Sequence, residues 1–254
     1  MFPDVVDLRD FYGTSLGQVA RRMIRQRARQ IWPDVTGLTL LGLGYATPYL
    51  RVFMDEAARV IAMMPATQGV LHWPRDERSL VALADEAELP LADFSVDRVM
   101  LVHAVECTEQ LRSMLRETWR VLAGNGRVLV VVPNRRGIWA RVDRTPFGQG
   151  HPFTQSQLSR LLRDSLFTPV RTASALFVPP TRSRMLLASA RAWEQLGARW
   201  FQTFSGVIVV EAEKQIYAAT PLRRPARLRP MLLPVVSGVR SSGGLRTADS
   251  RAAD

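Results

Sequence analysis

The amino-acid sequence predicts an α/β fold, in which a mostly parallel sheet is covered by helices on both faces. Short apolar runs that suit buried strands, such as residues 37–46 and 127–133, alternate along the chain with segments of helical periodicity. Strands that alternate with helices indicate right-handed crossovers, and therefore a parallel sheet. The composition, 47% hydrophobic and 22% charged over 254 residues, is that of a folded globular protein.

The expected elements follow one another in a regular order. Residues 15–31 place apolar side chains at helical spacing and arginines mostly on the opposite side, which predicts an amphipathic helix. Thr154, with Gln157 three residues later, predicts a capped helix start. The strands are expected at about 37–46, 58–65, 97–105, 127–133, 168–178 and 206–217, and the further helices at about 47–57, 108–122, 154–164 and 183–200, with a glycine-containing turn at 123–126.

Several classes of protein are excluded by composition. Cys107 is the only cysteine, so the chain has neither an intrachain disulfide framework nor a cysteine-based zinc site. No stretch approaches the roughly 18–20 consecutive apolar residues of a membrane-spanning helix. The first residues lack a basic segment followed by an apolar one, so we expect no secretory signal and a cytoplasmic location.

The charge and the composition change along the chain. The net charge is +11, but seven arginines against two aspartates lie in residues 218–254, which are rich in Pro, Arg, Ser and Gly. We expect that segment to be a disordered tail. The domain organisation predicted is therefore an N-terminal helical segment over 1–36, a main domain over 37–217 and the basic tail.

A glycine-containing loop is the sharpest local motif. Gly42, Leu43, Gly44, Tyr45 and Ala46 follow the first expected strand directly. Glycines there allow a ligand close to the backbone, and ligands of open parallel sheets bind at the carboxyl ends of the strands. A tight strand-to-helix turn without a ligand explains the same pattern equally well.

Further motifs follow in a characteristic order. After Gly42 and Gly44 come the segments 85–90 (DEAELP), 97–101 (DRVML) and 117–129 (ETWRVLAGNGRVL). Together they resemble the class I S-adenosylmethionine-dependent methyltransferases, closest to the type 11 branch, and the resemblance spans about residues 10–217. It implies a Rossmann-like fold with a seven-stranded, mostly parallel sheet, and S-adenosylmethionine as cofactor.

The resemblance also implies where the cofactor would bind. The loop at 42–46 would pass under its methionine part, Asp85 with the Glu86 backbone would hold the adenine edge, and His103 to Val105 would flank the sulfonium. Tyr12 would belong to a lid formed by the N-terminal segment. The implied cofactor-binding residues are Tyr12, Gly42, Leu43, Gly44, Tyr45, Ala46, Met64, Pro65, Asp85, Glu86, His103 and Val105.

The sequence departs from the family pattern at three positions. Leu40 stands where the family has an acid two residues before the first glycine, and Ala46 replaces the third glycine. Met64, followed by Pro65, stands where an acid usually binds the ribose hydroxyls. Such a carboxylate contributes about 1–3 kcal/mol of ligand affinity. Two functions therefore stay open: a methyltransferase with an atypical cofactor site, or a catalytically inactive methyltransferase-like subunit that acts as a protein-binding scaffold.

Catalytic residues are hard to predict, because methyl transfer needs a base only when the acceptor carries a proton. The candidates are His103, Glu106 and His151. Each candidate has a structural explanation as well. His103 would pack at the end of a strand, Glu106 would begin a loop, and the segment of His151 would lead into a capped helix. His72 has no partner at metal-ligand spacing, so we propose no metal.

The methyl acceptor is not indicated by the sequence, and both small molecules and macromolecules are open. Four arginines after the strand expected at 127–133 would suit an anionic substrate, RNA included, although solvated surface charge is the alternative. They are Arg135, Arg136, Arg141 and Arg144. A protein partner is expected under the scaffold alternative.

Overall fold

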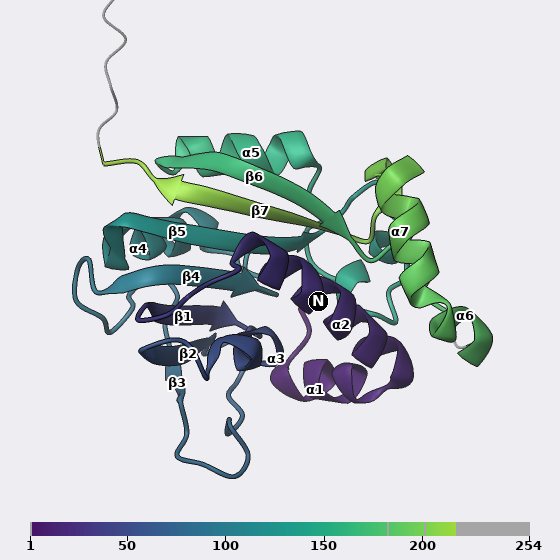
Figure 1. Ribbon diagram of the computed structural model, residues 1–254. Helices are drawn as coiled ribbons and strands as arrows, with labels where there is room; N and C mark the ends of the chain where they lie inside the picture. Colours follow the sequence, from purple (N-terminus) through teal and green to yellow (C-terminus); the bar gives the residue numbers. More distant parts are fainter. Residues whose placement is uncertain (1, 182, 201, 217–254) are drawn as a thin grey trace, which may run out of the picture. The chain divides into compact units, whose positions relative to one another are not determined.

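The computed structural model describes residues 2–181, 183–200 and 202–216, and these contain a seven-stranded sheet with helices on both faces (Figure 1). The strand order is β3-β2-β1-β4-β5-β7-β6, and only β7 runs antiparallel to its neighbours. The predicted α/β class and seven-stranded, mostly parallel sheet are thus confirmed. The strands are β1 (Thr39–Gly44), β2 (Arg59–Pro65), β3 (Val81–Ala84), β4 (Val96–Val102), β5 (Leu122–Pro133), β6 (Phe167–Ala175) and β7 (Val207–Lys214).

The helices divide between the two faces of the sheet. One apolar cluster joins the first three helices to one face, and a second joins α4 and α5 to the other. Figure 1 shows α2 crossing in front of the sheet. The α-helices are α1 (Val5–Gly13), α2 (Ser15–Ile31), α3 (Thr47–Leu50), α4 (Leu111–Val121), α5 (Gln155–Asp164), α6 (Arg184–Ala188) and α7 (Ala190–Trp200), and the 3-10 turns are η1 (Arg51–Phe53), η2 (Trp139–Arg141), η3 (Pro146–Gly148) and η4 (Gln202–Phe204).

The central strands are apolar on both faces because both faces are covered. In β1, Leu40 packs into the cluster under α1 to α3, while its neighbour Leu41 packs into the cluster under α4 and α5. Both side chains are fully buried. Side chains of a strand point alternately to opposite faces, so a run of consecutive leucines suits a central parallel strand.

Two helices begin and end as their sequences predict. The amphipathic α2 covers residues 15–31, starts at the capping hydroxyl of Thr14 and buries Ala20, Met23 and Ile24. At the start of α5, Thr154 and Gln157 form the predicted reciprocal capping box. Each cap supplies hydrogen bonds that the first turn of a helix cannot make internally.

Other elements differ from the prediction. The helix expected over 47–57 stops after α3 and η1, because the Ala58 N–H already donates to the Leu38 carbonyl and starts the next strand. The turn expected at 123–126 belongs to β5, which takes up its extra residues by a register shift against β4. The helix expected over 183–200 is divided at Ser189, and α1 is an additional helix.

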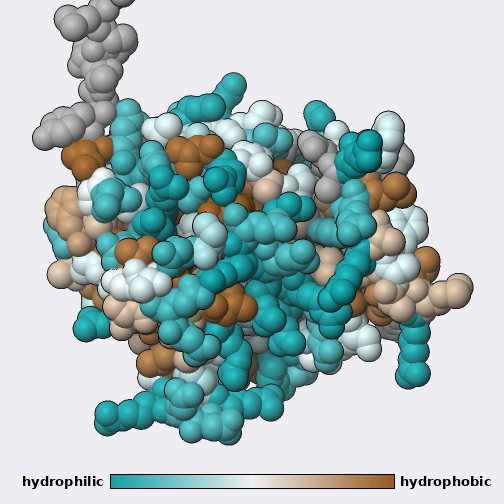
Figure 2. Space-filling view, in the orientation of Figure 1, coloured by the Kyte–Doolittle hydropathy of each residue, from teal (hydrophilic) through white to brown (hydrophobic). Residues whose placement is uncertain are grey.

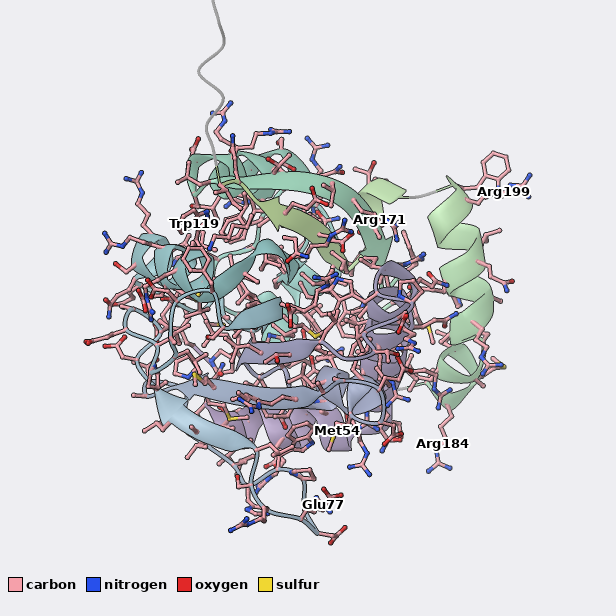
Figure 3. The ribbon with its side chains drawn as sticks, turned by 60° about the vertical axis from the view of Figure 1, so that its left-hand side comes forward. Met54, Glu77, Trp119, Arg171, Arg184 and Arg199 are labelled. Atoms are coloured by element: carbon pink, nitrogen blue, oxygen red, sulfur yellow. The ribbon has the colours of Figure 1, made fainter. Side chains whose placement is uncertain are left out.

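The carboxyl ends of β1, β2 and β4 lie at one edge of the sheet, and α1 lies beside that edge (Figure 1). A long loop without a helix joins β2 to β3, and Figure 3 shows Glu77 at its outer end. Within the part of the chain that the structure describes, no helix is both long and apolar enough to cross a membrane. The tail predicted over 218–254 lies outside the described residues.

Candidate functional site

The loop after β1 passes very close to the end of β4. Gly44 has a φ of +78°, and a Cβ there would lie 2.4 Å from the Val102 carbonyl oxygen. The next residue, Tyr45, donates its N–H to that same oxygen at 2.8 Å. Only glycine combines this left-handed backbone with so close an approach, so Gly44 holds the two strand ends together.

His103 and Glu106, two of the three predicted catalytic candidates, lie together directly after β4. The His103 Nδ1 and the Glu106 Oε1 are 3.1 Å apart, and both side chains are only 1% exposed. His103 has a φ of +50°, an uncommon conformation for a residue with a side chain. Its carbonyl accepts a hydrogen bond from the Gln68 side-chain amide at 3.0 Å. The uncommon backbone conformation of His103 thus places its imidazole beside the buried carboxylate of Glu106.

The other ring nitrogen of His103 faces two tyrosines. The Tyr12 hydroxyl lies 2.8 Å from His103 Nε2 and accepts a hydrogen bond from the Tyr49 hydroxyl at 2.7 Å. With Glu106 accepting from Nδ1–H, Nε2 is the unprotonated nitrogen and Tyr12 donates to it. Burial raises the pKa of Tyr12 well above its usual value, so Tyr12 stays a neutral donor. Tyr49 donates to Tyr12, Tyr12 donates to His103, and His103 donates to Glu106. The hydrogen bonds of this series therefore all run in one direction.

Helix α1 brings Tyr12 to this position. Asp4 caps its first turn by accepting from the N–H groups of Val6 and Asp7, each at 2.8 Å. The Val5 N–H donates to the Gln68 carbonyl at 2.8 Å, and Leu8 is fully buried. Tyr12 stacks on Tyr45 with ring centroids 5.6 Å apart. The N-terminal helix therefore covers the glycine loop and the histidine together.

A small cavity of about 40 Å³ lies between Phe2 and Pro3, which precede α1, and the segments that follow β2, β3 and β4. Gln68, Glu86 and Thr108 line it, and Glu86 accepts a hydrogen bond from the Thr108 hydroxyl at 2.9 Å. Two buried acceptors, Gln68 Oε1 in the cavity wall and Glu106 Oε2 beside His103, have no donor in the described residues. Buried polar atoms are almost always paired, so these oxygens suit donors that a ligand would bring.

This site fits the polar groups of the adenosyl cofactor that the sequence resemblance implies. Gln68 lies in the loop after β2, four positions after Met64, which stands where the family has a ribose-binding acid, and its free amide oxygen is an acceptor for a hydroxyl. The available space is far below the roughly 300–1,000 Å³ of small-molecule sites. Phe2 and Pro3 line it. Room for the whole cofactor would require this segment before α1 to move outward.

The remaining predicted cofactor residues lie at the same edge but differ in exposure. Met64 is buried in the apolar core, whereas Pro65 lines the small cavity. Asp85 is exposed and accepts from the Ala87 N–H in a local turn, while the Glu86 side chain faces the cavity. Leu43, Ala46 and Val105 are buried and apolar. Of the two acids, only Glu86 lines the small cavity.

His151 is separate from the histidine and glutamate pair. Its backbone N–H donates to the Glu106 carbonyl at 2.9 Å, but its ring lies edge-on to Phe2 with centroids 6.1 Å apart. His72 is bound to the Glu77 carbonyl at 3.0 Å. Among the residues that the structure describes, no three His, Cys, Asp or Glu side chains gather as metal ligands would.

The arginines after β5 make bonds within the chain. Arg135 donates to the Pro152 carbonyl at 3.1 Å, and Arg144 donates to the Pro180 carbonyl at 3.4 Å. Arg136 lines a separate cavity of about 820 Å³ near α5. These side chains lie apart from the pair of His103 and Glu106.

Sequence reasoning missed Gln68, Tyr49 and Thr108. No motif marks them, because each lies in a segment whose path depends on tertiary packing. One signal was available in the sequence. Gln68 is a polar residue four positions after Met64, and Met64 stands where the family has an acid.

The chain is similar to known proteins in both sequence and fold. Residues 41–130 match the family model of a methyltransferase domain, type 11. Two Mycobacterium tuberculosis proteins, from the strains CDC 1551 and H37Rv, are named as S-adenosylmethionine-dependent methyltransferases and are each 34% identical to this chain over 161 residues. The match covers 61% of this chain and 57% of those relatives, so the chain matches little more than half of their length.

Solved structures show the same fold. A SAM-dependent methyltransferase from Thermotoga maritima superposes with a TM-score of 0.61 at 15% identity, covering 83% of this chain and 95% of that one. A complex that contains the Haloferax volcanii Trm112 methyltransferase activator gives a TM-score of 0.56 at 16% identity, covering 85% of this chain and 100% of the matched chain. The fold is therefore the Rossmann-like class I methyltransferase fold.

Proposed function

We propose, from the type 11 methyltransferase domain that residues 41–130 of this chain carry, that the protein transfers a methyl group from S-adenosylmethionine to an acceptor hydroxyl. The observation that carries this proposal is the buried pair of His103 and Glu106 at the end of β4, with a hydroxyl already bound to His103 Nε2. In this view the Tyr12 hydroxyl occupies the place of the acceptor hydroxyl.

The cofactor, when bound, supplies a methyl group that its sulfonium already activates. We assign the methionine part to the backbone at residues 42–46, and a ribose hydroxyl to the free Gln68 amide oxygen. The Glu86 side chain would take the adenine edge. In this assignment Gln68 takes over the task of the acid that Met64 replaces, with a neutral acceptor in place of a charged one.

The base is needed because a hydroxyl is a poor nucleophile until its proton leaves. His103 Nε2 would accept that proton as the acceptor oxygen gains the methyl group, with S-adenosylhomocysteine leaving as the neutral thioether when the sulfur–methyl bond breaks. Glu106 would stabilise the resulting imidazolium through Nδ1–H. Both side chains are shielded from water, which strengthens their interaction. Orientation by the site supplies the rest of the acceleration.

The first experiment compares the wild type with His103→Gln and Glu106→Gln. Release of S-adenosylhomocysteine is measured with a panel of hydroxyl-bearing acceptors, and binding of S-adenosylhomocysteine is measured by calorimetry. We expect both variants to bind within about threefold of the wild type. We expect methyl transfer to fall about 10²–10⁴-fold in His103→Gln, the range of general-base catalysis, and less in Glu106→Gln.

His151→Gln is the matched control, because its ring makes no contact with the pair, and we expect it to keep wild-type rates. Unchanged turnover in His103→Gln would contradict the role of His103. Cofactor binding without turnover on any acceptor, together with a stable protein complex, would favour the inactive scaffold.

We also propose a cytoplasmic location, because S-adenosylmethionine is made in the cytoplasm.

A further inference from the structure

A second, larger cavity lies on the outer side of Tyr12. It has a volume of about 780 Å³ and is bounded by α1, α2, α3, η1 and the loop between β2 and β3. Tyr12 and Tyr45 form its inner wall. Because the Tyr12 hydroxyl reaches His103 Nε2, this wall separates the cavity from the proposed base by one side chain.

The walls of this cavity are strongly basic. Five arginines line it against a single acid, Asp76, and Figure 2 shows the face over α2 and α3 as largely hydrophilic. They come from separate parts of the chain, namely Arg9 on α1, Arg21 and Arg25 on α2, Arg51 on η1 and Arg75 on the loop after β2.

Four of these charges are uncompensated. Arg9 pairs with Asp10 at 2.9 Å, but Arg21, Arg25, Arg51 and Arg75 have neither an ion pair nor a hydrogen bond within the described chain. Arg21 and Arg25 are one helical turn apart, a spacing at which like charges repel. Burial, together with Arg21, Arg22 and Arg51, lowers the pKa of Arg25. Such crowding is unfavourable unless an anion occupies the site.

The Tyr45 hydroxyl experiences the same charges. Burial raises the pKa of Tyr45, but Arg9, Arg21 and Arg75 each act to lower it. Arginines from three elements therefore act together on one point of the cavity wall. Trp73 and His72 line the side formed by the β2–β3 loop, and they add flat surfaces next to the charges.

We propose that this cavity, called here the arginine cavity, binds a phosphate or diphosphate group of a small-molecule methyl acceptor. One carboxylate is satisfied by one guanidinium, whereas four uncompensated arginines suit a group with two or more negative charges. The volume lies within the range of small-molecule sites. An acceptor anchored there would present its hydroxyl to His103 where the Tyr12 hydroxyl now lies.

The identity of the occupant as methyl acceptor rests on the proposed function, but the anion site is testable without it. Inorganic pyrophosphate is titrated into the full chain at constant ionic strength, with sodium chloride as the reference. We expect saturable binding that weakens as salt rises, and a higher melting temperature with pyrophosphate.

The variant Arg21→Gln/Arg25→Gln tests the site directly. We expect at least tenfold weaker pyrophosphate binding, together with an unchanged or higher melting temperature in the absence of ligand, because the repulsion within α2 is removed. Arg112→Gln, an exposed arginine on α4 at the opposite face of the sheet, is the control and should bind pyrophosphate within twofold of the wild type.

The titration is repeated with saturating S-adenosylhomocysteine. Independent binding of both ligands supports the inference, whereas competition would assign the arginines to the cofactor and overturn it. Absence of pyrophosphate binding, or equal binding by the double variant, would also overturn it. Pyrophosphate binding without S-adenosylhomocysteine binding would contradict the proposed function and leave the anion site standing. Binding of RNA oligonucleotides but not of pyrophosphate would reject a small-molecule site.

Discussion

At the residue scale, the arrangement at the site depends on local backbone geometry that side-chain patterns do not reveal. His103 and Glu106 are three residues apart in a non-helical turn, where spacing does not determine whether two side chains face one another. The positive φ of His103 and the close approach of Gly44 bring them together. The sequence could therefore nominate both residues, but it could not predict their contact or separate them from His151.

The Tyr12 hydroxyl is expected to stabilise the fold in its observed position. Tyr12→Phe would leave Tyr49 and His103 Nε2 without their shared partner in a buried place, so we expect the free energy of unfolding to fall by about 1–3 kcal/mol. Chemical denaturation measures this. Tyr45→Phe is the control, because the Tyr45 hydroxyl has no hydrogen bond in the described chain, and a similar loss there would contradict the argument.

At the scale of elements, periodic patterns predicted α2 and the capping box of α5 because those features depend on local sequence. The end of the helix after β1 could not be predicted, since it is set by the hydrogen bond from Ala58 to Leu38 across the sheet edge. Gln68 could not be predicted either, because it lies in the loop between β2 and β3, whose path depends on tertiary packing.

Helix α1 is expected to control access to the cofactor site. Asp4→Ala removes both capping hydrogen bonds and should destabilise α1 by about 1 kcal/mol, which raises the ratio of the open to the covered state about fivefold. We expect S-adenosylhomocysteine to associate about three- to tenfold faster, as measured by stopped-flow fluorescence.

Asp10→Ala is the matched control for this helix. Like Asp4→Ala, it removes one negative charge. The interaction that it removes is an exposed ion pair with Arg9, which contributes little stability. We expect its association rate to equal that of the wild type. Equal rates in Asp4→Ala and Asp10→Ala would show that α1 does not limit entry.

At the scale of the whole molecule, the α/β class followed from the alternation of elements, and the seven-stranded, mostly parallel sheet from the family resemblance. The positive charge illustrates what composition could not tell. The net charge of +11 suggested only a basic surface and a tail, whereas the fold brings arginines from four separate segments to one cavity beside the proposed base. The proposed anion site thus depends on distant parts of the chain that meet only in the fold.

The departures from the family pattern have a structural account at this scale. Leu40 and Met64 are buried in the core under α1 to α3, so an acid at either position would need a partner there. We propose that Gln68 and Glu86, which line the small cavity from the loops after β2 and β3, bind the polar groups of the cofactor instead. The proposed site is therefore a rearranged cofactor site.

Calorimetric titration of the cofactor-free full chain with S-adenosylhomocysteine tests this central claim most directly. The account predicts one binding site in the micromolar range, and about tenfold weaker binding in Gln68→Ala, where the free acceptor is lost. No heat and no thermal stabilisation of the wild type at millimolar ligand would contradict it.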